Sequence, residues 1–258
     1  MKNNNKFRLD VWGAITLGTI ALYALFLLYP MAYLIRQSVL DPDTGSFTLA
    51  YFTKFFSKSY YFDTLINSFK VSITATVLSI AIGTPLAYLF TIFKIKGKSV
   101  LNILIVVASM SAPFIGAYSW ILLLGRSGVI TTFFKNLGIA IPDIYGFGGI
   151  VLVFLYAKGA LKNIDNSLIE AAENLGCSGI ACFFKVVLPL IIPTLLAAAL
   201  LVFMRSFADF GTPMLIGEGY RTFPVVLYTE FINEVGGSDG FAAAIAVIAI
   251  VITTLVFL

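Results

Sequence analysis

The sequence offers few side chains that could carry out covalent chemistry. Its 258 residues include no histidine, which excludes histidine general bases, histidine metal ligands and an axial histidine for haem. Cys177 and Cys182 are its two cysteines, and their spacing matches no metal or redox motif. We expect both to be small buried residues in a reducing cytoplasm. The sequence therefore predicts no metal site and no cofactor in this chain.

The sequence also lacks the chemistry needed to use ATP directly. No Gly-x-x-x-x-Gly-Lys-Ser/Thr phosphate loop occurs in it. The chain cannot bind ATP by that route, so ATP energy has to come from a partner. An intramembrane enzyme is disfavoured as well, because a Ser-His or zinc mechanism needs histidine and no intramembrane aspartate pair is evident.

Two charged residues, Arg205 and Asp209, lie four positions apart near the end of an apolar run. One interpretation is an i, i+4 ion pair that closes a helix end. The other is a gate or pore-lining pair near a translocation path, because charges at such depth are usually paired or water-facing. The sequence leaves both open.

The elements that position these residues are membrane-spanning helices. The chain is 59% hydrophobic and 12% charged with a mean hydropathy of +0.97, whereas soluble domains are about 25% charged. We predict an all-α polytopic membrane protein with six transmembrane helices, at residues 11–35, 64–93, 100–124, 147–161, 186–207 and 240–258. Pro30 is expected to kink the first helix. We expect residues 37–63 to form a loop and 129–137 a short interfacial helix.

The charge pattern predicts the orientation of these helices. With a cytoplasmic N-terminus, the inside segments carry nine basic and four acidic residues, against eight and nine outside. This agrees with the positive-inside rule and places residues 162–185 in the cytoplasm. The net charge of +4 is spread through loops, and no basic-aromatic patch indicates a nucleic-acid partner.

The cytoplasmic segment contains a spaced motif. Glu170-Ala171-Ala172 is followed after three residues by Gly176, and after nine more by an aliphatic residue, one residue and Leu-Pro ending at Pro189. On composition alone, the glutamate could be an ordinary solvated helix charge. The full spacing resembles the coupling motif of permease subunits of binding-protein-dependent, ATP-driven importers. The mild departure is Val186, where that family more often has isoleucine.

This resemblance implies the type I ABC importer permease fold with a cytoplasmic coupling helix at about 165–181. In that family the coupling helix sits in a cleft on the ATPase subunit. Glu170 would make polar contacts there, the two alanines would allow close packing, and Gly176 would allow the turn. Asn67-Ser68, residues 83–88 and the basic turn 94–98 resemble the start of the same permease core. The resemblance therefore covers roughly residues 47–258.

The resemblance also implies a division of the chain and a set of partners. Residues 1–62 would hold the cytoplasmic tail, the first transmembrane helix and a periplasmic loop, and residues 63–258 the permease core. The last apolar run has no basic stop after it, so we expect a core truncated at its C-terminus, the first half of a double-length permease. The expected partners are ATPase subunits carrying ATP-Mg, a periplasmic or lipid-anchored substrate-binding protein, a second permease copy or half, and membrane lipid.

The predicted function is import of a small solute across the bacterial inner membrane by alternating access. Residues 207–217 resemble permeases of the ferric iron, polyamine, thiamine and phosphonate branch, and the expected double-length form favours ferric iron. The Gly-rich acidic loop 208–239 either contacts the loaded binding protein or is only solvated. The alternative is a secondary transporter driven by an ion gradient. That class needs acidic residues in mid-membrane, and the predicted spans hold almost none.

Overall fold

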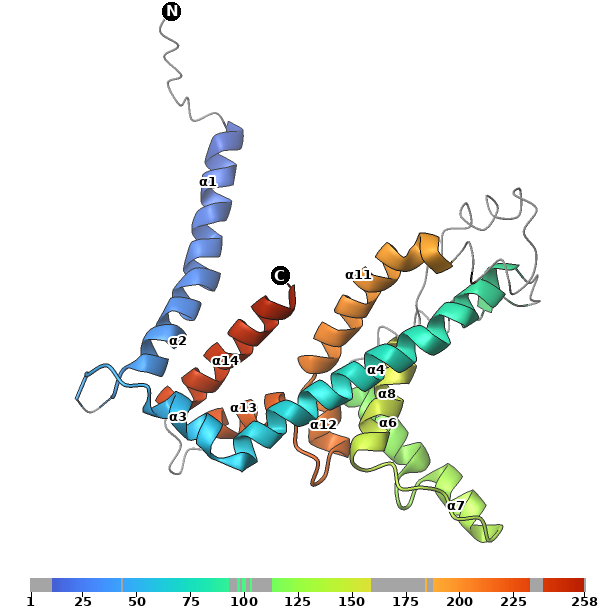
Figure 1. Ribbon diagram of the computed structural model, residues 1–258. Coiled ribbons are helices and arrows are strands. Elements are labelled where there is room, and N and C mark those ends of the chain that lie inside the picture. The colour runs from blue at the N-terminus through green and yellow to red at the C-terminus, as the bar shows by residue number, and fades with distance from the viewer. Residues whose placement is uncertain are drawn as a thin grey trace, which may run out of the picture. The chain divides into compact units, whose positions relative to one another are not determined.

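The computed structural model describes residues 11–42, 44–92, 113–158, 188–232 and 239–257, together with 97, 99–100, 103 and 184. The described residues are mostly helical, and their one β-type contact is an antiparallel pairing of Leu40 with Phe47. The predicted all-α fold is therefore confirmed (Figure 1). The chain divides into two compact units, Met1–Lys58 with Leu227–Leu258, and Ser59–Val226.

The first unit contains the N-terminal helices and the last helix of the chain. Its elements are α1 (Val11–Tyr23), the π-helical turn η1 (Ala24–Leu28), α2 (Tyr29–Val39), α3 (Ala50–Ser57) and α14 (Asp239–Phe257). Helix α14 packs on α2 and α3, as Figure 1 shows. The Lys54 ammonium lies 3.9 Å from the centroid of the Phe241 ring, a cation–π contact that joins α3 to α14.

Pro30 shapes the first helical run in a way that differs from a simple kink. The run stays helical from Val11 to Val39, but its hydrogen bonding changes at η1, immediately before the proline. A proline has no N–H and its ring crowds the carbonyl four residues earlier, here Phe26 inside η1. A π-turn widens the helix at that carbonyl, so the strain is absorbed locally.

The second unit holds the remaining helices. They are α4 (Ser59–Ile92), α6 (Pro113–Leu124), α7 (Val129–Asn136), α8 (Phe147–Lys158), α11 (Leu188–Phe207), α12 (Gly211–Ile216) and the start of α13 (Phe223–Ile232). Helix α11 runs along α4 (Figure 1). A cluster of aromatic rings joins the two helices, with the Phe69 ring 5.2 Å from Phe207 and 6.0 Å from Phe203.

The core of the second unit lies between α4, α6, α8 and α12. Its fully buried members include Ala75 of α4, Ala117 of α6, Ile150 of α8 and Ile216 of α12. Close backbone approach makes one glycine here irreplaceable. A Cβ on Gly149 would overlap the carbonyl group of Ile144, so only glycine fits at the start of α8.

The membrane spans agree with the prediction in part. Among the described residues, four helical runs are long and apolar enough to cross a membrane: Val11–Val39, Ser59–Ala87, Pro113–Asn136 and Asp239–Val256. Ile191–Phe207 is a shorter apolar helix. The described part of the fourth predicted span, α8, has 12 residues. Most of the third predicted span before Pro113 lies outside the described residues.

Two predictions about loops need correction, and one is confirmed. Residues 37–63 were expected to be a loop, but α3 lies within them and α4 begins at Ser59. Residues 208–239 were also expected to be a loop, yet they contain α12 and α13. Aromatic and small residues form short helices in both places because tertiary packing outweighs local propensity. The short helix predicted at 129–137 is confirmed as α7, Val129–Asn136.

Candidate functional site

Most of the predicted coupling motif lies outside the described residues. This holds for Glu170, Ala171, Ala172 and Gly176, so their role stays a prediction. Pro189 is described, as an exposed residue in the first turn of α11. Proline suits a first turn because its missing N–H would have no partner there.

Arg205 and Asp209 do not form the predicted helix-closing pair. Helix α11 ends at Phe207, so the two residues do not share one helix, and no ion pair joins them in the described part of the chain. Asp209 instead caps α12. Its carboxylate accepts hydrogen bonds from the N–H of Gly211 at 2.9 Å, the N–H of Thr212 at 3.3 Å and the Thr212 hydroxyl at 3.1 Å. A carboxylate there satisfies N–H groups that have no partner within the helix.

Helix α12 belongs to a longer stretch, residues 209–223, which we call the α12 segment. Its far end is bound to the beginning of α4. The Asn67 side-chain amide donates to the carbonyl of Arg221 at 3.1 Å, and the N–H of Phe223 donates to the Ser68 hydroxyl at 2.8 Å. Ser68 and Phe223 are buried, so this contact is shielded from water. The guanidinium of Arg221 also donates to the Tyr60 hydroxyl.

The same segment is bound to the beginning of α8. The N–H of Gly146 donates to the carbonyl of Ile216 at 2.8 Å. The Tyr220 ring packs 5.5 Å from the Phe147 ring, and its hydroxyl donates to the carbonyl of Asn67 at 3.4 Å. Burial raises the pKa of the Tyr220 phenol, which keeps its proton available for that bond.

Helix α6 supports the other end of the segment. A Cβ on Gly211 would lie 3.1 Å from the Cβ of Pro113, so α12 and α6 approach closely at this glycine. The rings of Phe114 and Phe210 meet edge to face with centroids 5.5 Å apart. Glycine at 211 therefore sets the distance between the two helices.

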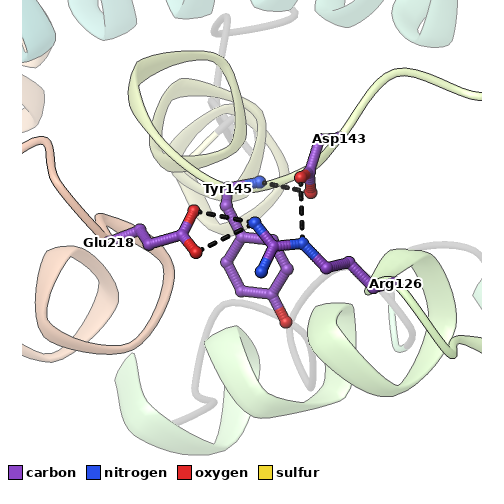
Figure 2. Close-up of polar contacts among 4 residues, drawn as sticks. All are labelled: Arg126, Asp143, Tyr145 and Glu218. Carbon is purple, nitrogen blue, oxygen red and sulfur yellow. Dashed lines mark hydrogen bonds and ion pairs between the residues drawn. The ribbon is translucent and has the colours of Figure 1, made fainter.

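An exposed ionic cluster joins the turn between α12 and α13 to the end of α6 (Figure 2). One guanidinium nitrogen of Arg126, Nη2, donates to both carboxylate oxygens of Glu218, at 2.9 and 3.0 Å. Its Nε donates to Asp143 at 3.2 Å, and the guanidinium carbon lies 4.8 Å from the Tyr145 ring centroid. Asp143 in turn accepts the N–H of Tyr145 at 3.3 Å. We call these four residues the Arg126 cluster.

The α12 segment is thus a junction where the start of α4, both ends of α6, the start of α8 and the end of α11 meet. Its contacts are hydrogen bonds, ion pairs and packing, and they form no nucleophile–base pair. No group of three or more His, Cys, Asp or Glu side chains in the described residues could hold a metal ion. The arrangement ties these helices to one another through a single short segment.

Sequence reasoning missed most of this junction. In the sequence Glu218 is one acid of the Gly-rich loop 208–239, and nothing there marks Arg126 or Asp143 as its neighbours. Asp143 lies 17 positions and Glu218 lies 92 positions from Arg126 in the sequence. No periodicity marks such pairs. The Asn67-Ser68 pair was the one available signal, through its resemblance to the start of a permease core.

Comparison with known families identifies the chain. Residues 47–258 match the model of the family described as "Binding-protein-dependent transport system inner membrane component". The chain belongs to this family. The match covers the range of the resemblance predicted from the motifs, so that prediction is confirmed. The family is one of inner membrane components of transport systems, so the chain is a multi-pass membrane permease of that kind.

Two relatives from Haemophilus influenzae are similar to this chain over different lengths. The "Putative ferric transport system permease protein FbpB 1" is 27% identical over 81% of this chain but only 34% of its own length. The "Spermidine/putrescine transport system permease protein PotB" is 28% identical over 98% of this chain and 93% of its own length. The chain thus spans about a third of the ferric relative and nearly all of the polyamine relative.

Solved structures with this fold include a bacterial ABC transporter involved in the import of the acidic polysaccharide alginate. It aligns with a TM-score of 0.73 at 17% identity, over 95% of this chain and 92% of its own. A second structure of the alginate transporter, in complex with a pentasaccharide-bound periplasmic protein, aligns with a TM-score of 0.72 at 17% identity over 95% and 91% of the two chains. At this identity the likeness shows the permease fold alone.

Proposed function

We propose that the chain is the transmembrane subunit of an ATP-driven importer that moves a small solute across the bacterial inner membrane by alternating access. The family match over residues 47–258 carries this proposal. A periplasmic substrate-binding protein delivers the solute, as the complex of the alginate transporter with its periplasmic protein supports by analogy. Two permease copies, or two halves, enclose the path.

Energy enters through the segment that contains Glu170 and Gly176. In our proposal the N-terminus is cytoplasmic, so this segment meets a separate ATPase subunit that binds ATP with Mg²⁺. The positive-inside charge pattern and the missing phosphate loop support this assignment. Closure of the ATPase dimer moves the coupling segment, and α11, which follows it in the chain, carries the movement to the α12 segment.

The α12 segment is the element that opens and closes the far side of the path. Its contacts with α4, α6 and α8 support this role, because helices that rock against one another must displace it. Asp209 takes part by capping α12. Arg205, exposed in the last turn of α11, remains the candidate for a gate contact with solute or partner.

Ferric iron is the proposed solute, supported by the ferric transport relative and by the resemblance of residues 207–217. Polyamine is the second candidate, because the PotB relative matches over nearly its whole length. Both solutes are cationic. Phosphonate and thiamine have no counterpart among the relatives named above.

The test is uptake into proteoliposomes that contain the permease with its ATPase and binding protein. We expect uptake to need ATP inside the vesicles and to be unaffected by ion gradients. Uptake driven by a proton or sodium gradient without ATP would instead establish the secondary transporter. Labelled ferric iron and spermidine, supplied separately with the binding protein, decide the solute.

The coupling role has its own test. Glu170→Arg is expected to abolish uptake, with Glu173→Arg, an acid of the same segment outside the triplet, as the matched control. Normal uptake by Glu170→Arg in a complex that retains its ATPase would refute the proposed role of this residue.

A further inference from the structure

Glu218 occupies a backbone conformation that its side chain does not favour. Its φ is 51°, and it is the one non-glycine residue with positive φ in the part of the chain that the structure describes. In the left-handed region the Cβ of an L-residue is crowded against its own backbone, whereas glycine adopts this region freely. Glycine stands on both sides, at 217 and 219, yet the left-handed position itself holds glutamate.

The side chain of Glu218 shows what this conformation achieves. The left-handed turn between α12 and α13, closed by the N–H of Tyr220 donating to the carbonyl of Gly217 at 2.7 Å, accompanies the placement of the Glu218 carboxylate on Arg126. Asp143 and the Tyr145 ring hold the guanidinium from two other directions (Figure 2). The carboxylate therefore meets a cation whose orientation is already fixed.

Stability does not account for the cluster. The side chains of Arg126, Asp143 and Glu218 are 62%, 48% and 52% exposed. Ion pairs exposed to this degree contribute little to folding, and salt screens them. A weak pair held at a strained backbone position points to a functional role for Glu218.

We infer that Arg126 is a positioning residue for transport, which holds Glu218 and thereby sets the place of α12 against the end of α6. The inference rests on the proposed role of the α12 segment. Ile216, two residues before Glu218, is fully buried in the core of the second unit, so a displaced turn displaces α12 with it. The cluster acts as a salt-sensitive latch between the turn after α6 and the turn after α12.

The test uses the reconstituted complex with three variants of the latch. Glu218→Gln removes the charge, Glu218→Gly removes charge and backbone strain together, and Arg126→Lys keeps a cation that cannot hold both carboxylates. The matched control is Asp63→Asn, which removes an exposed acid near the start of α4 that forms no ion pair with any described residue. Uptake rate, melting temperature and amide hydrogen exchange at residues 217–220 are measured for each.

We expect both Glu218 variants to lower uptake about 2- to 5-fold and to speed exchange of the Tyr220 amide by a similar factor, the range set by an exposed ion pair. The melting temperature of Glu218→Gly should be no lower than that of wild type. This variant loses the ion pair with Arg126, but glycine also removes the backbone strain at this position. The uptake rate and Tyr220 exchange rate of Arg126→Lys should lie between those of wild type and Glu218→Gln. Asp63→Asn should match wild type in both rates. Raising salt from about 0.05 M to about 0.5 M should reproduce the faster exchange in wild type only.

Hydrogen exchange separates this inference from the proposed function. Wild-type complex that takes up no solute with ATP refutes the importer, while exchange at Tyr220 still reports on the latch. Unchanged exchange in Glu218→Gln, or an equal salt effect in wild type and variant, refutes the latch. Faster exchange with wild-type uptake in both Glu218 variants shows a structural contact only and also refutes it.

Discussion

Three serines on one face of α4 allow a direct test of the hydrogen bond that joins α4 to the α12 segment. Ser68, Ser72 and Ser79 are each at most 2% exposed. The hydroxyl of Ser68 accepts the N–H of Phe223, whereas the hydroxyls of Ser72 and Ser79 have no partner among the residues that the structure describes. Phe223 is the first residue of α13, so this N–H has no partner inside its own helix. The adjacent Thr222 hydroxyl, although buried, also makes no hydrogen bond within the described part of the chain.

The structure therefore predicts different outcomes for the same chemical change. Ser68→Ala leaves a buried N–H unsatisfied, which costs about 1–3 kcal/mol. Ser72→Ala and Ser79→Ala remove hydroxyl groups that already lack partners, so these variants should be as stable as wild type or slightly more so. For a chain of this size, about 1 kcal/mol lowers the melting temperature by about 2–4 °C.

The measurement is thermal unfolding of the detergent-solubilised complex for all three variants. Ser68→Thr keeps the hydroxyl and serves as a control for the loss of the hydrogen bond itself. Equal melting temperatures for Ser68→Ala and Ser72→Ala would refute the reasoning, because burial and helix position are matched and only the bond differs. A large loss in Ser79→Ala would refute it too.

Three further predictions concern the cap of α12, the close approach at Gly149 and an exposed side chain of α7. Asp209→Ala should lose about 0.5–2 kcal/mol of unfolding free energy by uncapping α12, while Arg205→Ala stays near wild type in a melting assay. Gly149→Ala should prevent assembly of a stable α8, seen as failure to recover folded protein, because the added methyl group has no space. Phe133, 61% exposed on α7, should lie at the lipid boundary, so Phe133→Trp should be quenched by brominated lipid more strongly than Lys135→Trp.

The sequence was informative wherever one physical signal decides the structure. Apolar runs of bilayer length predict the spans, and the predicted helix at 129–137 matches α7 because its apolar and polar residues separate on a helical period. The motif spacing indicated the family because it combines three residue types, Glu170, Gly176 and Pro189, each expected at its position for a different physical reason. These signals are local, and a single sequence displays them fully.

The junction could not be predicted because its contacts are long-range and its elements are short. Helix α12 has six residues, too few for periodicity to register. The i, i+4 rule paired Arg205 with Asp209, but α11 stops at Phe207 and the carboxylate caps the next helix instead. A rule about neighbours on one helix fails when the helix ends between them.

The junction also shows how this chain distributes polar groups. Where the α12 segment meets α4 away from water, the contact is a neutral hydrogen bond between Ser68 and the N–H of Phe223, and the charged pair of Arg126 and Glu218 lies where water reaches it. Burying an ion pair costs several kcal/mol per ion, so charge is compatible with this fold mainly at the exposed rim. The exposed Arg126–Glu218 ion pair is weak and salt-sensitive, whereas the buried hydrogen bond between Phe223 and Ser68 is not screened by salt. One segment is therefore held by a buried hydrogen bond on the α4 side and by an exposed, salt-sensitive ion pair on the α6 side. If the α12 segment moves as proposed, the exposed ion pair is the contact expected to break first.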